Sequence, residues 1–167
     1  MIAGTNSGCG KTTVTCAVLQ ALVNRKINVS SFKCGPDYID PMFHKTVIGT
    51  AAYNLDTYLM SNDAVNYLLN KNSGDIAVIE GVMGFYDGFS FTEKGSTHEL
   101  SEITDTDVIL VVNCRGMSLS AMALVKGFKE FRKNNIKGVI FNNLSEKLYG
   151  DLSEDCLLYT SPSPRDR

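Results

Sequence analysis

The sequence predicts a three-layer α/β fold, in which a mostly parallel sheet is covered by helices on both faces. The apolar runs are short and continuous rather than alternating, and stretches with helical spacing separate several of them, as is typical of parallel strands buried on both sides. A glycine-rich turn between the first run and the first helical stretch fits the same architecture. The expected strands are Met1–Ala3, Val29–Lys33, Ile76–Glu80, Val108–Val112 and Val139–Asn142.

Helical spacing of apolar residues marks three segments between these strands. The first follows the glycine-rich turn, the second runs from about Asn62 to Asn70, and the clearest is Ser120–Phe131, which has a broad apolar face. In the first helix, the stripe predicted to pack on the sheet consists of Val14, Ala17, Val18, Ala21 and Leu22.

Polar side chains gather at one end of the predicted strands. Ligands of parallel α/β sheets bind outside the carboxyl ends of the strands. The residues at or just beyond those ends are Lys33, Glu80, Asn113 and Asn142. We therefore expect one rim of the sheet to carry the functional site, together with the glycine-rich turn.

Composition and charge restrict the kind of partner. With 167 residues, 44% of them apolar, and a net charge of −2, the chain fits about one domain with a substantial core. No apolar run approaches the roughly 18–20 residues of a membrane span, no signal-peptide pattern is present, and no block of Lys or Arg offers a nucleic-acid surface. We expect a cytoplasmic protein that binds small molecules, with neither membrane nor nucleic acid as a partner. Its five cysteines lack C-x-x-C spacing and are expected to be free thiols.

The segment Gly4–Thr13 has the features of a phosphate-binding loop. Its glycines let backbone N–H groups face inward, and the following helix aims its positive dipole end at the same point. Lys11 is expected to reach the β and γ phosphates of a nucleoside triphosphate, and the Thr12 hydroxyl to ligate the accompanying Mg²⁺. Thr5 stands where the strict Gly-x4-Gly-Lys-[Ser/Thr] pattern has glycine, so the loop is a variant; the alternative is a tight connection with a surface lysine. The predicted nucleotide-binding residues here are Gly8, Cys9, Gly10, Lys11, Thr12 and Thr13.

The segment Phe32–Pro41 places one cation and two carboxylates on a turn beside this loop. Lys33 is expected to neutralise charge on a transferred phosphoryl group, while Asp37 and Asp40 organise Mg²⁺ or orient a reacting group. A surface turn with solvated charges is the alternative, because turns favour Pro, Gly and Asp.

The segment Glu80–Gly88 follows a buried strand. An acidic residue at such a place needs a cation or hydrogen bonds to stay charged, and Mg²⁺ would satisfy Glu80. Asp87 is predicted to be catalytic, although Asp-Gly is also a common turn signal.

Together, Gly4–Thr13, Phe32–Pro41 and Glu80–Gly88 resemble the amino-terminal synthetase domain of the cobyrinic acid a,c-diamide synthase family. Members of this family are ATP-dependent, glutamine-using ligases of cobalamin biosynthesis. The resemblance covers roughly residues 1–148 and implies a P-loop NTPase fold like that of dethiobiotin synthetase. It also implies that ATP and Mg²⁺ convert the a and c carboxylates of cobyrinic acid into acyl phosphates, which ammonia then attacks to give amides.

The resemblance also assigns roles residue by residue. Lys11 and Lys33 would hold phosphates, and Thr12 and Glu80 would ligate Mg²⁺. The residues that would shape the substrate and catalytic region are Asp37, Tyr38, Ile39, Asp40 and Asp87. Two further matches are softer. The segment Gly95–Thr97, with Ser96 and Thr97, would face the substrate, and Asn142 would read adenine; a loop cap and a strand-end turn are their respective alternatives. Asn113 departs from the acidic residue expected after its strand.

A glutaminase site is not expected in this chain. Such a site needs a cysteine nucleophile with a histidine base, and in the family the histidine follows the cysteine. Both histidines here, His44 and His98, precede Cys114 and Cys156. Ammonia would therefore come from a separate glutaminase domain, and the chain alone is expected to be poorly active or inactive. His44 is interpreted either as a substrate contact or as a hydrogen-bonded surface histidine. The sequence also leaves open whether the protein forms a homodimer.

Both ends of the sequence depart from the pattern of the middle. Only three residues precede Gly4, fewer than the usual strand of about 5–6 residues, so residues 1–148 are expected to be a synthetase domain incomplete at both ends. The polar segment Asp151–Arg167 has no helical or strand period, and its last part resembles sequencing-adapter read-through. We expect residues 149–167 to be a disordered or non-native tail.

The same motifs also allow other interpretations. The same chemistry could act on another tetrapyrrole such as a nickel sirohydrochlorin, or the chain could be a nucleotide-switch or partition ATPase. Asn6 replaces the signature lysine of partition ATPases, and the two aspartates of Phe32–Pro41 also weigh against that class. The string Gly35–Asp40 is typical neither of dethiobiotin synthetase nor of cobyric acid synthase.

Overall fold

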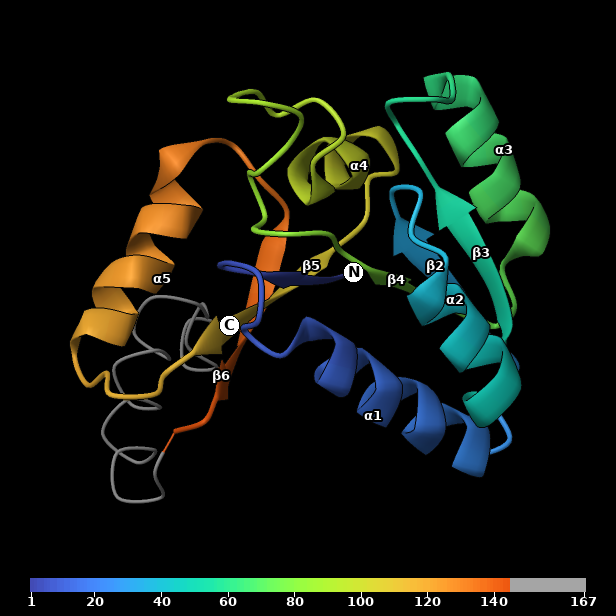
Figure 1. Ribbon diagram of the computed structural model, residues 1–167, viewed down its shortest axis with the longest axis horizontal. Helices are drawn as coiled ribbons and strands as arrows, with labels where there is room; N and C mark the ends of the chain where they lie inside the picture. The colour runs from blue at the N-terminus through green and yellow to red at the C-terminus, as the bar shows by residue number, and fades with distance from the viewer. Residues whose placement is uncertain (145–167) are drawn as a thin grey trace, which may run out of the picture.

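A six-stranded parallel sheet forms the centre of the molecule (Figure 1). The computed structural model describes residues 1–144, so the predicted tail lies outside the described residues. The strands are β1 (Ile2–Gly4), β2 (Val29–Cys34), β3 (Ala51–Leu55), β4 (Ile76–Glu80), β5 (Val108–Asn113) and β6 (Ile136–Asn142), and their order in the sheet is β3-β2-β4-β1-β5-β6. The helices are α1 (Lys11–Asn24), α2 (Ile39–Phe43), the π-helical turn η1 (His44–Ile48), α3 (Asn62–Asn72), α4 (Thr97–Ile103) and α5 (Ser120–Phe131).

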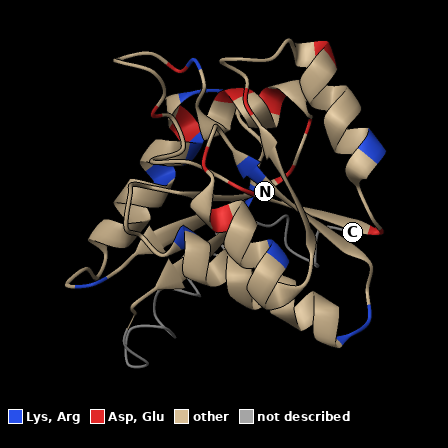
Figure 2. Cartoon of the chain, turned by 45° about the vertical axis from the view of Figure 1, so that its right-hand side comes forward, with Lys and Arg blue, Asp and Glu red and all other residues tan. Residues whose placement is uncertain are grey.

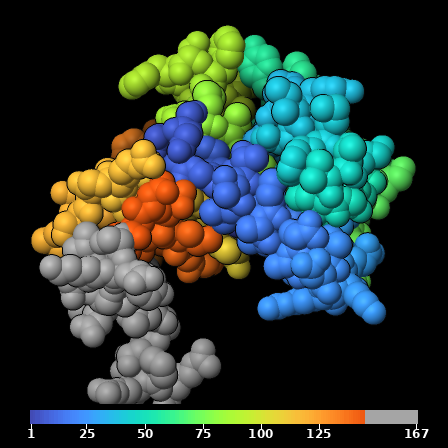
Figure 3. All heavy atoms as spheres, turned by 60° about the horizontal axis from the view of Figure 1, so that its bottom comes forward, coloured from blue at the N-terminus to red at the C-terminus, as the bar shows by residue number. Residues whose placement is uncertain are grey.

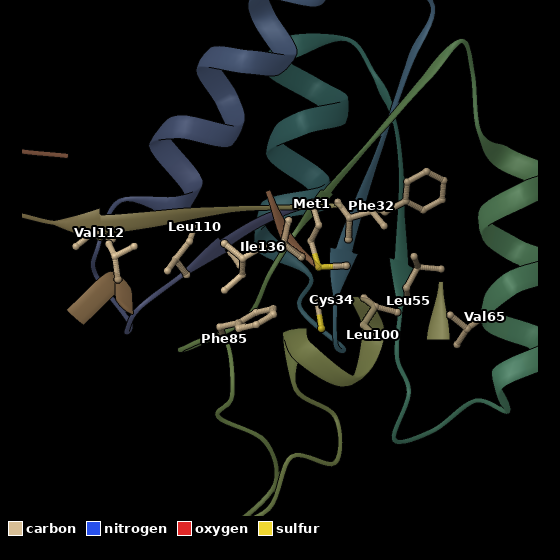
Figure 4. Close-up of a cluster of buried hydrophobic side chains, with 14 of the residues drawn as sticks. Met1, Phe32, Cys34, Leu55, Val65, Phe85, Leu100, Leu110, Val112 and Ile136 are labelled. Carbon is tan, nitrogen blue, oxygen red and sulfur yellow. The ribbon is translucent and has the colours of Figure 1, made fainter. Parts of the chain in front are cut away.

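Helices cover both faces of this sheet, which confirms the predicted three layers. Buried side chains of α1 and η1 pack on one face through a cluster that includes Leu19, Ile48 and Val111. The other face carries α3, α4 and α5, whose Val65, Leu100, Ala121 and Val125 join the larger core cluster. Figure 4 shows this cluster, with Phe32, Leu110 and Phe85 lying between the sheet and the helices. Because successive strand residues alternate between two apolar layers, the central strands β1, β4 and β5 are apolar up to their carboxyl ends, whereas β2 carries Ser30, Ser31 and Lys33.

The five predicted strands are all present, but the sequence analysis missed β3. This edge strand pairs only with β2, and most of its residues, Ala51 to Asn54, are partly or fully exposed. Alanine and asparagine are uncommon in strands, so an edge strand of this composition gives no strong signal. The short helices α2 and α4 and the turn η1 were also missed, because each spans only five to seven residues.

The apolar stripe predicted for α1 was partly wrong. Ala17 and Ala21 are exposed, whereas Thr15 and Leu19 are buried against the sheet. The buried face starts at Lys11 and continues one turn at a time through Thr15 and Leu19. The phosphate loop therefore sets the helix rotation, because Lys11 must turn inward at its first residue.

Residues of both charge signs are interspersed over the fold rather than separated by sign (Figure 2). Within residues 1–144, no helix has the length and apolarity needed to cross a lipid bilayer.

Candidate active site

The loop between β1 and α1 curls over the amino end of the helix. Gly8 and Gly10 have φ values of +76° and +105°, a region that glycine enters without strain. Gly4 lies so close to the Cys9 and Lys11 side chains that a β-carbon there would collide with both. This close approach explains why glycine stands at position 4, one residue before the strict pattern. Figure 3 shows the loop, in dark blue, at the surface of the molecule.

Lys11 turns back into this loop. Its ammonium Nζ donates to the backbone oxygens of Asn6, at 3.1 Å, and Met83, at 2.5 Å. Burial lowers the pKa of Lys11, and neighbouring carboxylates that include Glu80 and Asp87 oppose part of this shift. A buried ammonium held by two backbone carbonyls can exchange them for phosphate oxygens, which are stronger, charged acceptors.

Gly10 combines a positive φ with a close neighbouring side chain. Replacement of Gly10 by alanine would strain the backbone and push a β-carbon into the Asn142 amide, which itself donates to the Cys9 carbonyl at 2.9 Å. We expect Gly10→Ala to weaken ATP binding at least roughly tenfold, the size of about 1–3 kcal/mol of strain.

The matched control for this change is Gly49→Ala. Gly49 also has a positive φ, +82°, but a β-carbon there meets open space. Calorimetric titration with ATP should show unchanged affinity for Gly49→Ala. Equal losses in the two variants would mean that the loop geometry is not specific to the nucleotide site.

Lys33 is the centre of a second polar cluster at the same rim. The strand register pairs Lys33 of β2 with Glu80 of β4, so their side chains leave the sheet next to each other. The Lys33 Nζ lies 2.5 Å from Asp40 Oδ2, 3.0 Å from Glu80 Oε1 and 3.6 Å from Asp37 Oδ2. Three carboxylates therefore surround one ammonium, and the strand register places Lys33 and Glu80 side by side at the predicted rim of the sheet.

Burial and charge act in opposite directions within this cluster. Burial disfavours the charged form of Glu80, but His44, Lys33 and Thr12 outweigh it and lower its pKa to about 2. Burial likewise disfavours the Lys33 ammonium, yet Glu80 and Asp40 raise its pKa. For Asp40, burial prevails over the contact with Lys33 and raises its pKa. The fully buried Glu80 thus remains an anion.

Thr12 joins the phosphate loop to this cluster. Its hydroxyl donates to Glu80 Oε1 at 2.6 Å, the same oxygen that contacts Lys33. One carboxylate oxygen therefore connects the first turn of α1 with the end of β2. The two motifs, far apart in the sequence, form a single site.

The sequence analysis missed the residue that supports Glu80 from behind. His44, in η1, is fully buried, so its interpretation as a surface histidine was wrong. Its Nδ1 lies 2.6 Å from the Ser31 hydroxyl, and its Nε2 lies 3.4 Å from Glu80 Oε2. A tautomer with the proton on Nε2 accepts from Ser31 and directs its N–H toward Glu80. Ser31 lies two residues before Lys33 on the same face of β2, a spacing that could have indicated a polar partner there.

We expect His44→Leu to destabilise the fold by about 2–4 kcal/mol, because it leaves the Ser31 hydroxyl and one oxygen of a buried carboxylate without a partner. Urea unfolding measures this change. Thr46→Ala, at an exposed position in the same turn, is the control and should change stability by less than about 0.5 kcal/mol. A His44→Leu protein as stable as the control would show that the Ser31–His44–Glu80 contacts contribute nothing to the fold.

The remaining predicted substrate residues lie in two different environments. Tyr38 and Ile39 are 78% and 71% exposed and lie at the start of α2. Asp87 is exposed and accepts a hydrogen bond from the Gly84 amide at 3.0 Å. It therefore stabilises a turn, which was the alternative to a catalytic role, and that catalytic role stays a prediction.

Ser96 and Thr97, by contrast, are fully buried. Ser96 caps α4 by accepting from the Glu99 amide, and Thr97 Oγ1 bonds both the amide and the carbonyl of Val82. In this conformation they brace the loop that follows β4, as the loop-cap alternative expects. Their contact with substrate stays a prediction. Asn142 contacts the phosphate loop through Cys9, and its role toward adenine also stays a prediction.

These features define a P-loop nucleotide-binding protein: a parallel sheet, a glycine-rich loop between β1 and α1, a buried loop lysine and a threonine beside a strand-end carboxylate. The chain belongs to the CobQ/CobB/MinD/ParA nucleotide binding domain family, whose sequence model matches residues 1–160.

Three relatives of this chain share one name. A cobyrinate a,c-diamide synthase of Thermoplasma volcanium is 48% identical over 91% of the chain, and one of Priestia megaterium is 46% identical over 88%. A cobyrinate a,c-diamide synthase of Methanocaldococcus jannaschii is 41% identical over 97%. The chain spans about a third of the length of these relatives: 34%, 33% and 37%.

Proposed function

We propose that this chain is the ATP-using part of a ligase that amidates the a and c carboxylates of cobyrinic acid in cobalamin biosynthesis. The observation that carries the proposal is the Lys33 cluster, which sets one ammonium among three carboxylates directly against the phosphate loop. The shared name of relatives more than 40% identical over most of the chain supports the choice of substrate.

The proposed chemistry follows from the charges of the site. A carboxylate is a poor electrophile, and transfer of the γ-phosphoryl group of ATP gives it a leaving group, so the protein must chiefly position the reactants and neutralise charge. Lys11 would hold the β and γ phosphates from inside the loop. Lys33, whose raised pKa keeps it protonated, would face the transferred phosphoryl group and steer the substrate carboxylate toward it.

Mg²⁺ fits the oxygen donors present. The Thr12 hydroxyl and the Glu80 carboxylate lie together at the start of α1, and among the described residues Glu80 Oε2 has no hydrogen bond shorter than its 3.4 Å contact with His44 Nε2. Asp37 Oδ2 lies 3.6 Å from the Lys33 ammonium of the same cluster. The three carboxylates leave an excess of negative charge that suits a divalent cation. Residues 1–144 contain no group of three or more His, Cys, Asp or Glu side chains arranged as a metal site, so nucleotide oxygens and water would complete the shell, as is usual for Mg²⁺. When bound, Mg²⁺ would neutralise phosphate charge.

The nitrogen donor in this proposal is ammonia that reaches the acyl phosphate from a glutaminase domain outside this chain. The exposed position of Tyr38 and Ile39 beside Asp37 supports their proposed contact with the incoming substrate. We also propose that the enzyme acts in the cytoplasm.

Substrate-dependent ATP turnover tests this function. The purified chain is supplied with ATP, Mg²⁺ and an ammonium salt, so that no glutaminase is needed, and ADP release is measured with and without cobyrinic acid. We expect cobyrinic acid to stimulate ADP release at least about tenfold. ATP turnover indifferent to tetrapyrroles would instead favour a nucleotide-switch ATPase.

A further inference from the structure

A cavity of about 280 Å³ lies beside the Lys33 cluster. We call it the Tyr58 cavity. Its walls are mostly apolar and aromatic, and the residues that matter here are Tyr58, Leu59, Val82, Met83, Phe89 and Lys94. Tyr58 and Phe89 face each other with ring centroids 5.2 Å apart.

The walls of the cavity are fixed by backbone hydrogen bonds. Buried Asp56 accepts from the amides of Tyr58 and Leu59 at 2.9 and 3.2 Å. On the opposite side, the Phe89 amide donates to the Lys94 carbonyl at 2.8 Å. The large apolar side chains nevertheless remain open to solvent, with Leu59 72% and Phe89 62% exposed. An exposed apolar surface of this kind is typical of a ligand-binding site.

Lys94 places a solvent-exposed positive charge beside this apolar surface. Its ammonium lies 5.1 Å from the centre of the Tyr58 ring and forms no ion pair with a carboxylate within residues 1–144. The carboxylate in the wall, Asp56, is 4% exposed and already accepts two backbone hydrogen bonds. The cavity therefore suits a ligand that joins an apolar body to a peripheral anion.

The cavity adjoins the proposed reaction site. Met83, in its wall, accepts the hydrogen bond of Lys11 through its carbonyl. Gly35 and Pro36, also in its wall, connect Lys33 to Asp37 along the chain. A ligand seated here therefore lies next to the segments that carry Lys11, Lys33 and Asp37.

We propose that the Tyr58 cavity binds one apolar edge of the tetrapyrrole ring, and that Lys94 binds a peripheral carboxylate other than the one being activated. This inference rests on the proposed function and adds the residues that select the substrate. The cavity is near the small end of ligand pockets, roughly 300–1,000 Å³, so it receives an edge of the ring rather than the whole of it. The apolar contact supplies affinity for the tetrapyrrole. Lys94 determines which peripheral carboxylate of the ring points at Lys33.

The test compares binding of cobyrinic acid and of ATP to the same protein preparations by calorimetric titration. Lys94→Glu and Phe89→Ala change exposed side chains and should leave the fold and ATP affinity intact. We expect each to weaken cobyrinic acid binding roughly five- to tenfold, the effect of one charge-assisted or aromatic contact.

Two control variants match these changes. Lys71→Glu removes a lysine that also lies over a tyrosine ring, 5.3 Å from Tyr67, but on α3. Phe91→Ala removes a fully exposed phenylalanine that does not line the Tyr58 cavity. Both should bind cobyrinic acid like the unmodified chain.

The possible outcomes distinguish a failure of this inference from a failure of the proposed function. Unchanged cobyrinic acid affinity in Lys94→Glu and Phe89→Ala, with substrate-stimulated turnover intact, overturns the Tyr58 cavity as the ring site and leaves the proposed function standing. An unmodified chain that binds ATP but neither binds cobyrinic acid nor responds to it overturns both.

Discussion

Lys33→Met is expected to lower substrate-dependent ATP turnover about a thousandfold while ATP still binds. The change keeps an unbranched side chain but removes the only ammonium within 4 Å of Asp37, Asp40 and Glu80 among the described residues. Without it, the transferred phosphoryl group loses its proposed counter-charge, and the buried Glu80 loses one of its three polar partners. We therefore also expect a loss of stability of about 3–5 kcal/mol, the cost of breaking a buried pair.

Single-turnover measurement of ADP formation, together with urea unfolding, separates these two effects. Lys45→Met, an exposed lysine in η1, is the control and should behave like the unmodified chain. A folded Lys33→Met protein that turns over ATP at the normal, substrate-stimulated rate would contradict the role given to Lys33.

Glu80→Gln should lower turnover at least about a hundredfold and raise the Mg²⁺ concentration needed for half-maximal rate. Glutamine keeps the shape of the side chain and can still accept from Thr12, but it loses the negative charge that Lys33 and the cation share. The measurement is the dependence of ATP turnover on Mg²⁺ concentration.

The control for this change is Glu130→Gln, which alters an exposed glutamate of α5 that is 3.9 Å from Lys126. Its Mg²⁺ dependence should be normal. If Glu80→Gln keeps both the rate and the Mg²⁺ dependence of the unmodified chain, then Glu80 is a purely structural anion.

The central strands and the two polar motifs could be predicted because they depend on local sequence. Continuous apolar runs identify parallel strands, and the ends of those runs alone place Lys33 and Glu80 at one rim of the sheet. The register that pairs these two residues decides that they touch, and register between parallel strands is not readable from either strand alone.

The parts that could not be predicted depend on long-range packing. His44 reaches Glu80 only because η1 folds back across the face of β2, and nothing near His44 in the sequence indicates its burial. The Tyr58 cavity likewise joins residues from three separate connections, of which the one carrying Tyr58 and Leu59 follows the edge strand β3 that sequence patterns did not indicate. The family resemblance led us to expect that Thr97 faces the substrate. Its hydrogen bonds to Val82 could not be predicted, because they form only when the loop folds.

The most direct test of the proposed function is mass spectrometry of cobyrinic acid after incubation with the chain, ATP, Mg²⁺ and isotopically labelled ammonium. We expect one or two carboxylates to become amides that carry the label, and neither product to form without ATP or with Lys33→Met. ATP consumption that leaves cobyrinic acid unlabelled would contradict the proposed amidation.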